Sequence, residues 1–259
     1  MIDIHNHVLP GIDDGAADMA ESIEMCRIAA RDGIKVIVAT PHSFDGNRVT
    51  DPELIRRMVK DLNQALQAKG VDVKVLAGME TRVGPDLPEL LSADKIVPLN
   101  QGRYVLLEFD RAHVPAGFDR LVNRLKELGY GIVLGHPEKN LRLQSDQEYL
   151  PKLMASLGAW DLIIQISADS LTGAAGRQAY KAARLLLKRG LVHVIATDAH
   201  SVAVRPPLLS PALVEAGKIV GEARARQMVH DIPLAVLKGI GFPKLEEPQP
   251  TKRWWRIFS

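Results

Sequence analysis

Seven apolar segments alternate with helical patterns along most of this chain, which predicts a parallel α/β fold. The apolar segments are rich in Val, Ile and Leu and span residues 2–6, 34–40, 73–79, 103–109, 130–135, 161–166 and 191–197. Their hydrophobicity is continuous, so both faces of the predicted sheet should be covered. Strands separated by helices in this way are typical of βα units wound into one parallel sheet.

The segments between these strands carry the periodicity of amphipathic helices. The clearest pattern spans 52–69, begins with Pro52 and ends before Gly70. Its apolar stripe consists of Ile55, Met58, Val59, Leu62 and Leu66. Further helices are predicted at 18–32, 117–128 and 174–189, and beyond residue 208. The stretch 145–157 opens with the capping-box pattern Ser145-x-x-Glu148, although Pro151 allows a break there.

Polar residues that could bind a metal ion follow nearly every predicted strand. They are His5, His7, His42, Glu80, Glu108, His136, Asp198 and His200. An open sheet concentrates functional groups at its switch point, whereas a barrel brings the carboxyl ends of all its strands to one mouth. The distribution therefore predicts a (β/α)7 barrel with a metal site at the C-terminal ends of the strands. His5 and His7 share a strand face, as do Asp198 and His200 if that strand continues so far.

The composition narrows the possible classes of protein. The 259 residues are 46% hydrophobic, which suffices for one large core in a single domain. The formal net charge of +2 offers no broad field for nucleic acid or a membrane surface. The only cysteine, Cys26, lies in an apolar helical pattern, which argues against a disulfide framework and a cysteine phosphatase. We expect a cytoplasmic protein, because the first strand leaves no room for a signal peptide and no apolar run has membrane-spanning length.

The candidate ligands are imidazoles and carboxylates without thiolates, a set that favours Mn, Fe, Zn or Mg over a structural zinc site. Five histidines with Glu80, Glu108, Asp198 and Asp14 are too many for one ion and fit two or three ions with bridging carboxylates. Such a cluster lowers the pKa of a bound water and neutralises phosphoryl oxygens. Phosphoester hydrolysis is therefore the expected reaction.

Other polar residues are expected to serve structure. Asp18, with Glu21 three residues later, fits a helix N-cap, and Asp14 could be a cap instead of a ligand. Glu138 is expected at the surface or behind the ligands. Three histidines outside the motifs are assigned to structure or solvent: His113, His193 and His230.

These motifs together resemble a known family. The residues that carry the resemblance are His5-Asn6-His7-Val8-Leu9-Pro10-Gly11-Ile12-Asp13-Asp14-Gly15, then Thr40–His42, Gly78–Glu80, Leu106–Phe109, Gly135–Glu138 and Thr197–His200. Their order and spacing are similar to the PHP (polymerase and histidinol phosphatase) superfamily. Within it, the opening segment is similar to bacterial tyrosine-protein phosphatases of capsule and exopolysaccharide operons. The similarity runs from residue 1 to about 240.

The resemblance implies a distorted PHP-type barrel over residues 1–245. From composition alone, a proline-rich stretch at 243–250 leads to a basic-aromatic tail, so 246–259 is predicted to be a linker and tail outside the barrel. The resemblance also implies two or three divalent ions, with manganese expected and Fe, Zn, Co or Mg as alternatives. His5, His7, Glu80 and Asp198 would bind one ion, Glu80, Glu108 and His136 a second, and Asp14, His42 and His200 a third. Arg205 falls where the family has an arginine for the substrate phosphate. At the other such position this chain has Lys139, which keeps the charge but loses the bidentate fork.

The same resemblance implies hydrolysis of phosphotyrosine in a protein, with a bacterial tyrosine kinase of polysaccharide export as the expected substrate. A small-molecule phosphatase, such as a histidinol-phosphate phosphatase, is one alternative. A non-catalytic regulatory PHP module is another. The tail at 251–259 has the composition of a short membrane anchor, although a terminus without that role is the simpler hypothesis.

Overall fold

Parallel strands dominate the computed structural model, which describes residues 1–45, 48–157 and 162–240. One sheet has the order β1 (Ile2–Asn6), β2 (Val36–Ala39) and β5 (Lys74–Ala77). The other has the order β10 (Val194–Ala196), β9 (Leu162–Ser167), β8 (Gly131–Leu134), β7 (Tyr104–Glu108) and β6 (Glu80–Arg82). Every pairing within these two sheets is parallel.

Backbone hydrogen bonds join the two sheets along a first seam. The N–H of His7 donates to the carbonyl of Ala199 over 2.9 Å, and the N–H of Asp198 donates to the carbonyl of His5 over 2.9 Å. The end of β1 is therefore paired with the chain that leaves β10. This pairing brings the first and last metal motifs of the sequence side by side.

A second seam lies beside Glu80. The N–H of Ser43 donates to the carbonyl of Glu80 over 2.8 Å, and the N–H of Glu80 donates to the carbonyl of Pro41 over 3.1 Å. Only Gly78 and Met79 separate β5 from β6, so these are two parts of one interrupted barrel strand. A side chain at Gly78 would place its Cβ 2.7 Å from Val38, which explains why glycine occupies the break. With both seams closed, the predicted seven-stranded barrel is confirmed.

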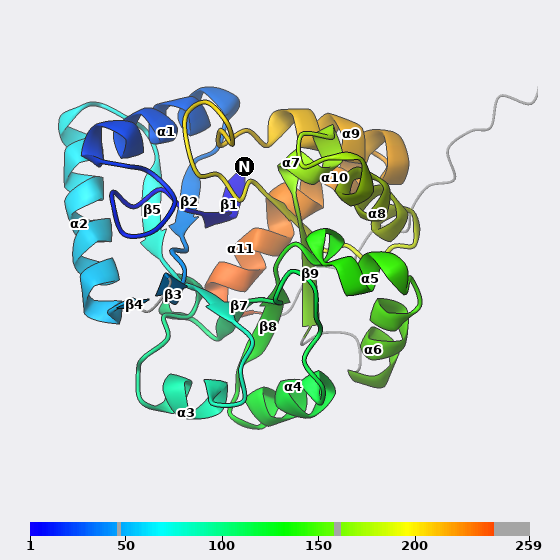
Figure 1. Cartoon of the computed structure of the whole chain (residues 1–259). Helices are drawn as coiled ribbons and strands as arrows, with labels where there is room; N and C mark the ends of the chain where they lie inside the picture. The colour runs from blue at the N-terminus through cyan, green and yellow to red at the C-terminus, as the bar shows by residue number, and fades with distance from the viewer. Residues whose placement is uncertain (46–47, 158–161, 241–259) are drawn as a thin grey trace, which may run out of the picture.

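Helices surround the barrel and follow its strands in turn (Figure 1). They are α1 (Met19–Asp32), α2 (Pro52–Ala68), α3 (Leu87–Ser92), α4 (Phe118–Glu127), α5 (Leu141–Ser145), α6 (Tyr149–Leu157), α7 (Ala168–Thr172), α8 (Arg177–Lys188), α9 (Ser210–Val220), α10 (Glu222–Val229) and α11 (Asp231–Lys238). Two 3-10 turns span Leu99–Gln101 and Pro137–Lys139, and a short hairpin of β3 (Phe44–Asp45) and β4 (Arg48–Val49) follows β2. The hairpin was not predicted.

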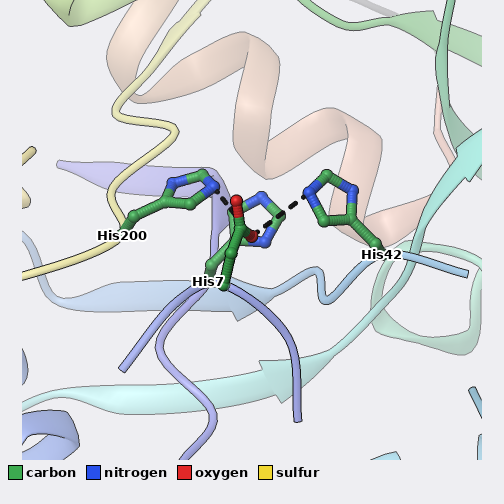
Figure 2. Close-up of side chains that lie close together, drawn as sticks. His7, His42 and His200 are labelled. Atoms are coloured by element: carbon green, nitrogen blue, oxygen red, sulfur yellow. Dashed lines mark ion pairs between the residues drawn. The ribbon is translucent and has the colours of Figure 1, made fainter. Parts of the chain in front are cut away.

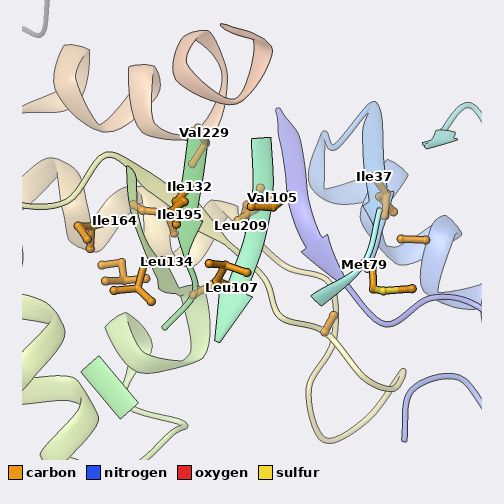
Figure 3. Packing of buried hydrophobic residues seen from close by; sticks show 14 of the residues in the cluster. Ile37, Met79, Val105, Leu107, Ile132, Leu134, Ile164, Ile195, Leu209 and Val229 are labelled. Carbon is orange, nitrogen blue, oxygen red and sulfur yellow. The ribbon is translucent and has the colours of Figure 1, made fainter. Parts of the chain in front are cut away.

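The core is divided by the alternation of side chains along each strand. Leu106 and Val133 belong to a cluster inside the barrel, which Val236 of α11 joins near the starts of the strands. Their neighbours Leu107 and Leu134 belong to the larger cluster between strands and outer helices (Figure 3). Apolar side chains thus fill the barrel interior near the starts of the strands, and the polar residues at the strand ends form the site.

The capping-box prediction for the helix at 145–157 was wrong. Ser145 does not cap the helix that follows it, because it is the last residue of α5 and its Oγ donates to the carbonyl of Arg142 over 2.8 Å. Asn140 caps α5 instead by accepting from the N–H of Leu143. Pro151 lies in the first turn of α6 and does not interrupt it.

The proline-rich segment 243–250 and the tail 251–259 lie outside the described residues, so the linker and anchor hypotheses stay predictions. Among the helices that are described, none has the length and apolar character needed to cross a membrane.

Candidate metal centre

Three histidines from distant parts of the chain face one another beyond the strand ends (Figure 2). His7 follows β1, His42 follows β2 and His200 follows β10. The rings of His7 and His200 are stacked, with 3.9 Å between their centroids. Asp14 Oδ1 lies 3.4 Å from Nε2 of His42 and 3.4 Å from Nε2 of His200. Donor atoms of the four residues lie within 4.8 Å of one another, close enough to bind one ion.

Glu80 lies at the centre of the site and contacts four imidazoles. Its Oε1 is 2.7 Å from Nε2 of His136 and 3.2 Å from Nε2 of His5. Its Oε2 is 3.1 Å from Nδ1 of His42 and 3.4 Å from Nε2 of His7. The residue is 1% exposed. Burial alone would raise the pKa of Glu80, but the surrounding histidines outweigh burial and hold the pKa well below its usual value.

The carboxylates in turn make the histidines strongly basic. Burial alone would lower the pKa of His42, but its contacts with Asp14 and Glu80 outweigh this and raise the pKa to about 11. The same balance between burial and nearby carboxylates raises the pKa of His7 to about 9 and that of His136 to about 9. A pocket with this much negative charge attracts cations, whether protons or metal ions.

The donor atoms of the nine predicted ligands fall into four compact groups. These are His7 with Asp14, His42 and His200; His5 with His7 and Glu80; His5 with His136 and Asp198; and His42 with Glu80 and Glu108. These groups differ in part from the sets implied by the resemblance: Glu108 is grouped with His42 instead of His136, and Asp198 with His136 instead of His7 and Glu80. His7 also joins the group of Asp14. Burial and the neighbouring Glu80 raise the pKa of Glu108, so a cation beside both carboxylates would relieve their repulsion.

Several observations fit divalent metal ions. The buried Oε2 of Glu80 makes no hydrogen bond of normal geometry within the described part of the chain. The Nε2 atoms of His5 and His7 face each other at 3.4 Å, an arrangement that a shared cation would stabilise. The donors are all nitrogen and oxygen, as Mn, Fe, Zn and Mg accept. Cys26 is buried on α1, and burial raises the pKa of its thiol to about 12, so it is neither ligand nor nucleophile.

Two residues that were not predicted orient the first pair of histidines. Nδ1 of His7 lies 2.7 Å from Oδ2 of Asp13, and Nδ1 of His5 lies 3.0 Å from Oε1 of Gln165. Because each oxygen accepts a hydrogen bond from an Nδ1–H group, Nε2 of each ring is left free to face the cluster. The signals available in the sequence were the Asp-Asp pair and one amide within an apolar strand. A Cβ at Gly15 would lie 2.0 Å from the His7 carbonyl, so only glycine permits this close turn.

His5 and His7 lie close enough to reach one ion, with 3.4 Å between their Nε2 atoms, although β1 ends at Asn6 and His7 lies just beyond it. The shared face of Asp198 and His200 was predicted only if the last strand continued that far. The strand does not continue, because β10 ends at Ala196 and Asp198 is left-handed with φ 53°. Nδ1 of His200 turns back to the Asp198 carbonyl at 2.9 Å. His136 is also left-handed, with φ 33°, a strain typical of functional sites.

The alternative roles of the acidic residues are also decided. Asp18 is the N-cap of α1 and accepts from the N–H of Glu21 over 2.9 Å, as predicted. Asp14 precedes that cap by four residues, so Asp14 does not cap α1 and its cap alternative is wrong. Glu138 is not a surface residue: it is 1% exposed and accepts from the N–H of Ser167 and the hydroxyl of Ser170.

The three histidines outside the motifs lie away from the cluster. His193 is buried between strands, where its Nδ1 accepts from the N–H of Ile164 over 3.1 Å. His113 and His230 are exposed and lie beside Asp110 and Asp231 respectively. All three serve structure or solvent contacts, as predicted.

Both predicted phosphate-binding cations reach the cluster. Lys139 Nζ is 3.0 Å from Asp198 Oδ2 and 3.0 Å from Asp169 Oδ2. Arg205 contacts Asp198 through Nη2, and its Nε is 3.8 Å from Asp169 Oδ2. Asp169 was not predicted. Its only signal was its position just after the apolar strand that ends at Ser167.

A cavity of about 600 Å³ opens above these groups. Ligand candidates, both cations and the apolar side chains of Phe109, Leu141 and Val204 line it. Val204 is 83% exposed and Leu141 is 45% exposed, so these two side chains form an apolar rim on part of a cavity that is otherwise lined largely by polar and charged residues. The cavity has the size of a small-molecule or side-chain site, and its mouth is open to a larger substrate.

Comparisons with known proteins agree with this geometry. The sequence profile for capsular polysaccharide synthesis, CpsB/CapC, matches residues 1–238. Tyrosine-protein phosphatase YwqE of Bacillus subtilis is 35% identical over 253 residues, covering 98% of this chain and 97% of YwqE. The putative tyrosine-protein phosphatase CapC of Staphylococcus aureus is 32% identical over 209 residues, covering 81% of this chain and 80% of CapC.

A solved structure resembles the whole chain. It comes from work on YwqE of Bacillus subtilis and CpsB of Streptococcus pneumoniae, described there as unique metal-dependent tyrosine phosphatases. It matches with a TM-score of 0.89 at 34% sequence identity, covering 98% of this chain and 100% of the other.

Proposed function

This chain belongs to the CpsB/CapC family of capsular polysaccharide synthesis, and we propose that it is a metal-dependent protein-tyrosine phosphatase. The observation that carries the proposal is the cluster around Glu80 on the floor of an open cavity, with two cations beside it. The relatives named tyrosine-protein phosphatases support the same activity.

The nine clustered residues would hold two or three divalent ions, and manganese is the ion we propose. Bound ions would supply hydroxide near neutral pH and neutralise charge on the phosphoryl oxygens. Glu80 would bridge two ions, because each of its oxygens contacts a different pair of histidines. Asp13 and Gln165 keep the imidazoles of His7 and His5 oriented toward the ions.

The cations and the rim determine which substrate fits. Arg205 can grip two phosphoryl oxygens through its planar fork, and Lys139 adds a mobile point charge. The apolar rim of Leu141 and Val204 suits a phenyl ring carried on a protein. A phenolate leaving group, with a reference pKa of about 10, needs less help from a general acid than an alkoxide does. We therefore assign no general acid.

We also propose that the natural substrate is a tyrosine kinase of capsule or exopolysaccharide export. The capsular synthesis family supports this choice. A complete donor set is difficult to reconcile with a non-catalytic module, because nine clustered ligand candidates would serve no purpose there.

The test is turnover of a phosphotyrosine peptide by protein reconstituted with manganese and analysed for bound metal. Chelation should abolish turnover, added manganese should restore it, and thiol alkylation should change little. Histidinol phosphate and a phosphoserine peptide are the comparison substrates. Full turnover in a preparation free of transition metals would overturn the metal mechanism. Preference for histidinol phosphate would make the chain a small-molecule phosphatase instead.

A further inference from the structure

Asp169 occupies the one strand end for which the sequence predicted no functional residue. The helix α7 directly follows β9 (Figure 1). Asp169 lies in the first turn of α7 and lines the cavity. Its side chain is 16% exposed. Oδ2 lies 3.0 Å from Lys139 Nζ and 3.8 Å from Arg205 Nε. Oδ1 is buried and, among the described residues, has no hydrogen-bond partner.

Two carboxylates share the same two cations. Asp198 Oδ2 also contacts Lys139 Nζ, at 3.0 Å, and Nη2 of Arg205. Asp198 is one of the proposed metal ligands, and a carboxylate that binds a divalent ion has less negative charge left for a neighbouring cation. Asp169 belongs to none of the four donor groups. Its charge therefore remains available to Lys139 and Arg205 when the metal site is filled.

We propose that Asp169 is a positioning residue that holds Lys139 and Arg205 over the metal centre in the arrangement that receives the substrate phosphate. The proposal rests on the proposed phosphatase function. Both cations have donors to spare, since an ammonium has three N–H bonds and a guanidinium five. A contact with Asp169 thus fixes their location and leaves other N–H groups for phosphoryl oxygens.

Charge repulsion alone predicts that removing Asp169 has the opposite effect on phosphate binding from the one expected of a positioning residue. A carboxylate beside a phosphate site repels the dianionic substrate, so its removal should tighten phosphate binding and leave or improve kcat/KM. If Asp169 positions the cations, its removal lets both side chains collapse onto Asp198 or swing into solvent. Phosphate binding and turnover should then weaken. The sign of the effect separates the two explanations.

The first experiment compares Asp169→Asn with Asp110→Asn in manganese-loaded protein. Asp110 lines the same cavity and is paired with His113, and among the described residues it forms no ion pair with Lys139 or Arg205, so it controls for loss of one negative charge. Asp169→Asn should lower kcat/KM on a phosphotyrosine peptide by on the order of 10-fold, as loss of a supporting partner typically does, with bound metal unchanged. Asp169→Glu should restore part of the loss. An increase, or equal effects in the two Asn variants, would overturn the proposal.

A double-mutant cycle tests whether Asp169 acts through the cations. In an Arg205→Ala, Lys139→Ala background, Asp169→Asn should cost much less than it does in the wild type, because the groups that it positions are gone. A purely structural role would give additive losses and would refute the inference.

Binding of inorganic phosphate keeps the inference separate from the proposed activity. Calorimetry on the manganese-loaded proteins should show that Asp169→Asn binds phosphate more weakly than wild type and Asp110→Asn. If no variant hydrolyses phosphotyrosine but this difference remains, the proposed function fails and the role of Asp169 stands. Equal phosphate affinity would reject the role of Asp169, whatever the substrate.

Discussion

At the scale of single residues, the number of partners around each carboxylate sets its expected role. Glu80 is buried and contacts four histidines through two oxygens. Asp14 has a side chain that is 66% exposed and contacts two histidines through one oxygen. A bridging ligand needs two free oxygens facing two ions. Only the first of these carboxylates meets that requirement.

Removal of Glu80 should therefore disturb more than one ion. We expect Glu80→Ala to lose more bound metal than Asp14→Ala, while circular dichroism shows that both variants remain folded. Elemental analysis after dialysis against the same metal solution gives the comparison. Equal metal content in the two variants would show that the bridging assignment is wrong.

The two cations should differ in kind as well as in strength. Arg205→Ala should reduce kcat/KM by on the order of 10²-fold, as loss of an electrostatic stabiliser does, because the guanidinium fork can tighten on two oxygens in the transition state. Lys139→Ala should cost less and mainly raise KM, since an ammonium holds substrate and transition state alike. Lys139→Arg should preserve or improve turnover. Steady-state kinetics on one phosphotyrosine peptide, with metal content measured, gives all three values. A kcat/KM close to wild type in Arg205→Ala would show that Arg205 does not bind the substrate phosphate.

At the scale of elements, hydrophobic periodicity located the barrel strands and most helices to within a few residues. It placed α2 at 52–69, for example, and the helix spans Pro52–Ala68. Elements that depend on contacts were missed. β6 starts anew at Glu80 because the chain must pass Val38 closely at Gly78, and no local pattern encodes that neighbour. Ser145 was predicted to begin the helix at 145–157 but ends α5 instead, and neither α5 nor its cap Asn140 was predicted.

Asn140 also ties α5 to the loop at the cavity rim. Its Nδ2 donates to the carbonyls of Asp110 and His113 over 2.7 Å and 3.0 Å, while its Oδ1 caps the helix. Asn140→Ala removes all three bonds and should lower the free energy of unfolding by about 1–3 kcal/mol. Ser145→Ala, at the exposed end of the same helix, is the control and should cost less than 1 kcal/mol, roughly the value of one solvated hydrogen bond. Urea unfolding measures both; equal losses would contradict the linking role of Asn140.

At the scale of the whole molecule, barrel closure determines which residues meet. Asp3 Oδ1 accepts from the N–H of Thr197 over 2.9 Å, although 194 residues separate them in the chain. Motifs at successive strand ends could be predicted to converge, because a barrel brings all such ends together. Partners such as Gln165 and Asp169 could not, because their roles depend on which side chain of another strand lies opposite. The ligand candidates were thus predictable from sequence, and the residues that orient them were not.

One contribution to the acid response of the fold comes from His193, which lies just before β10 and contacts β9. Burial, with a smaller contribution from Arg224, lowers the pKa of His193 to about 4, and its Nδ1 must stay unprotonated to accept from Ile164. The unfolded chain takes up a proton near its ordinary pKa of 6.5 and the folded chain does not. Stability is therefore lost as pH falls from about 6.5 toward 4, by on the order of 3 kcal/mol for this one group. His193→Asn keeps an acceptor near Nδ1 without the titration, so its urea-unfolding free energy should fall less steeply over that range. Carboxylates and metal-site histidines titrate in both proteins and cancel in the difference. Parallel pH profiles would show that His193 contributes nothing to acid sensitivity.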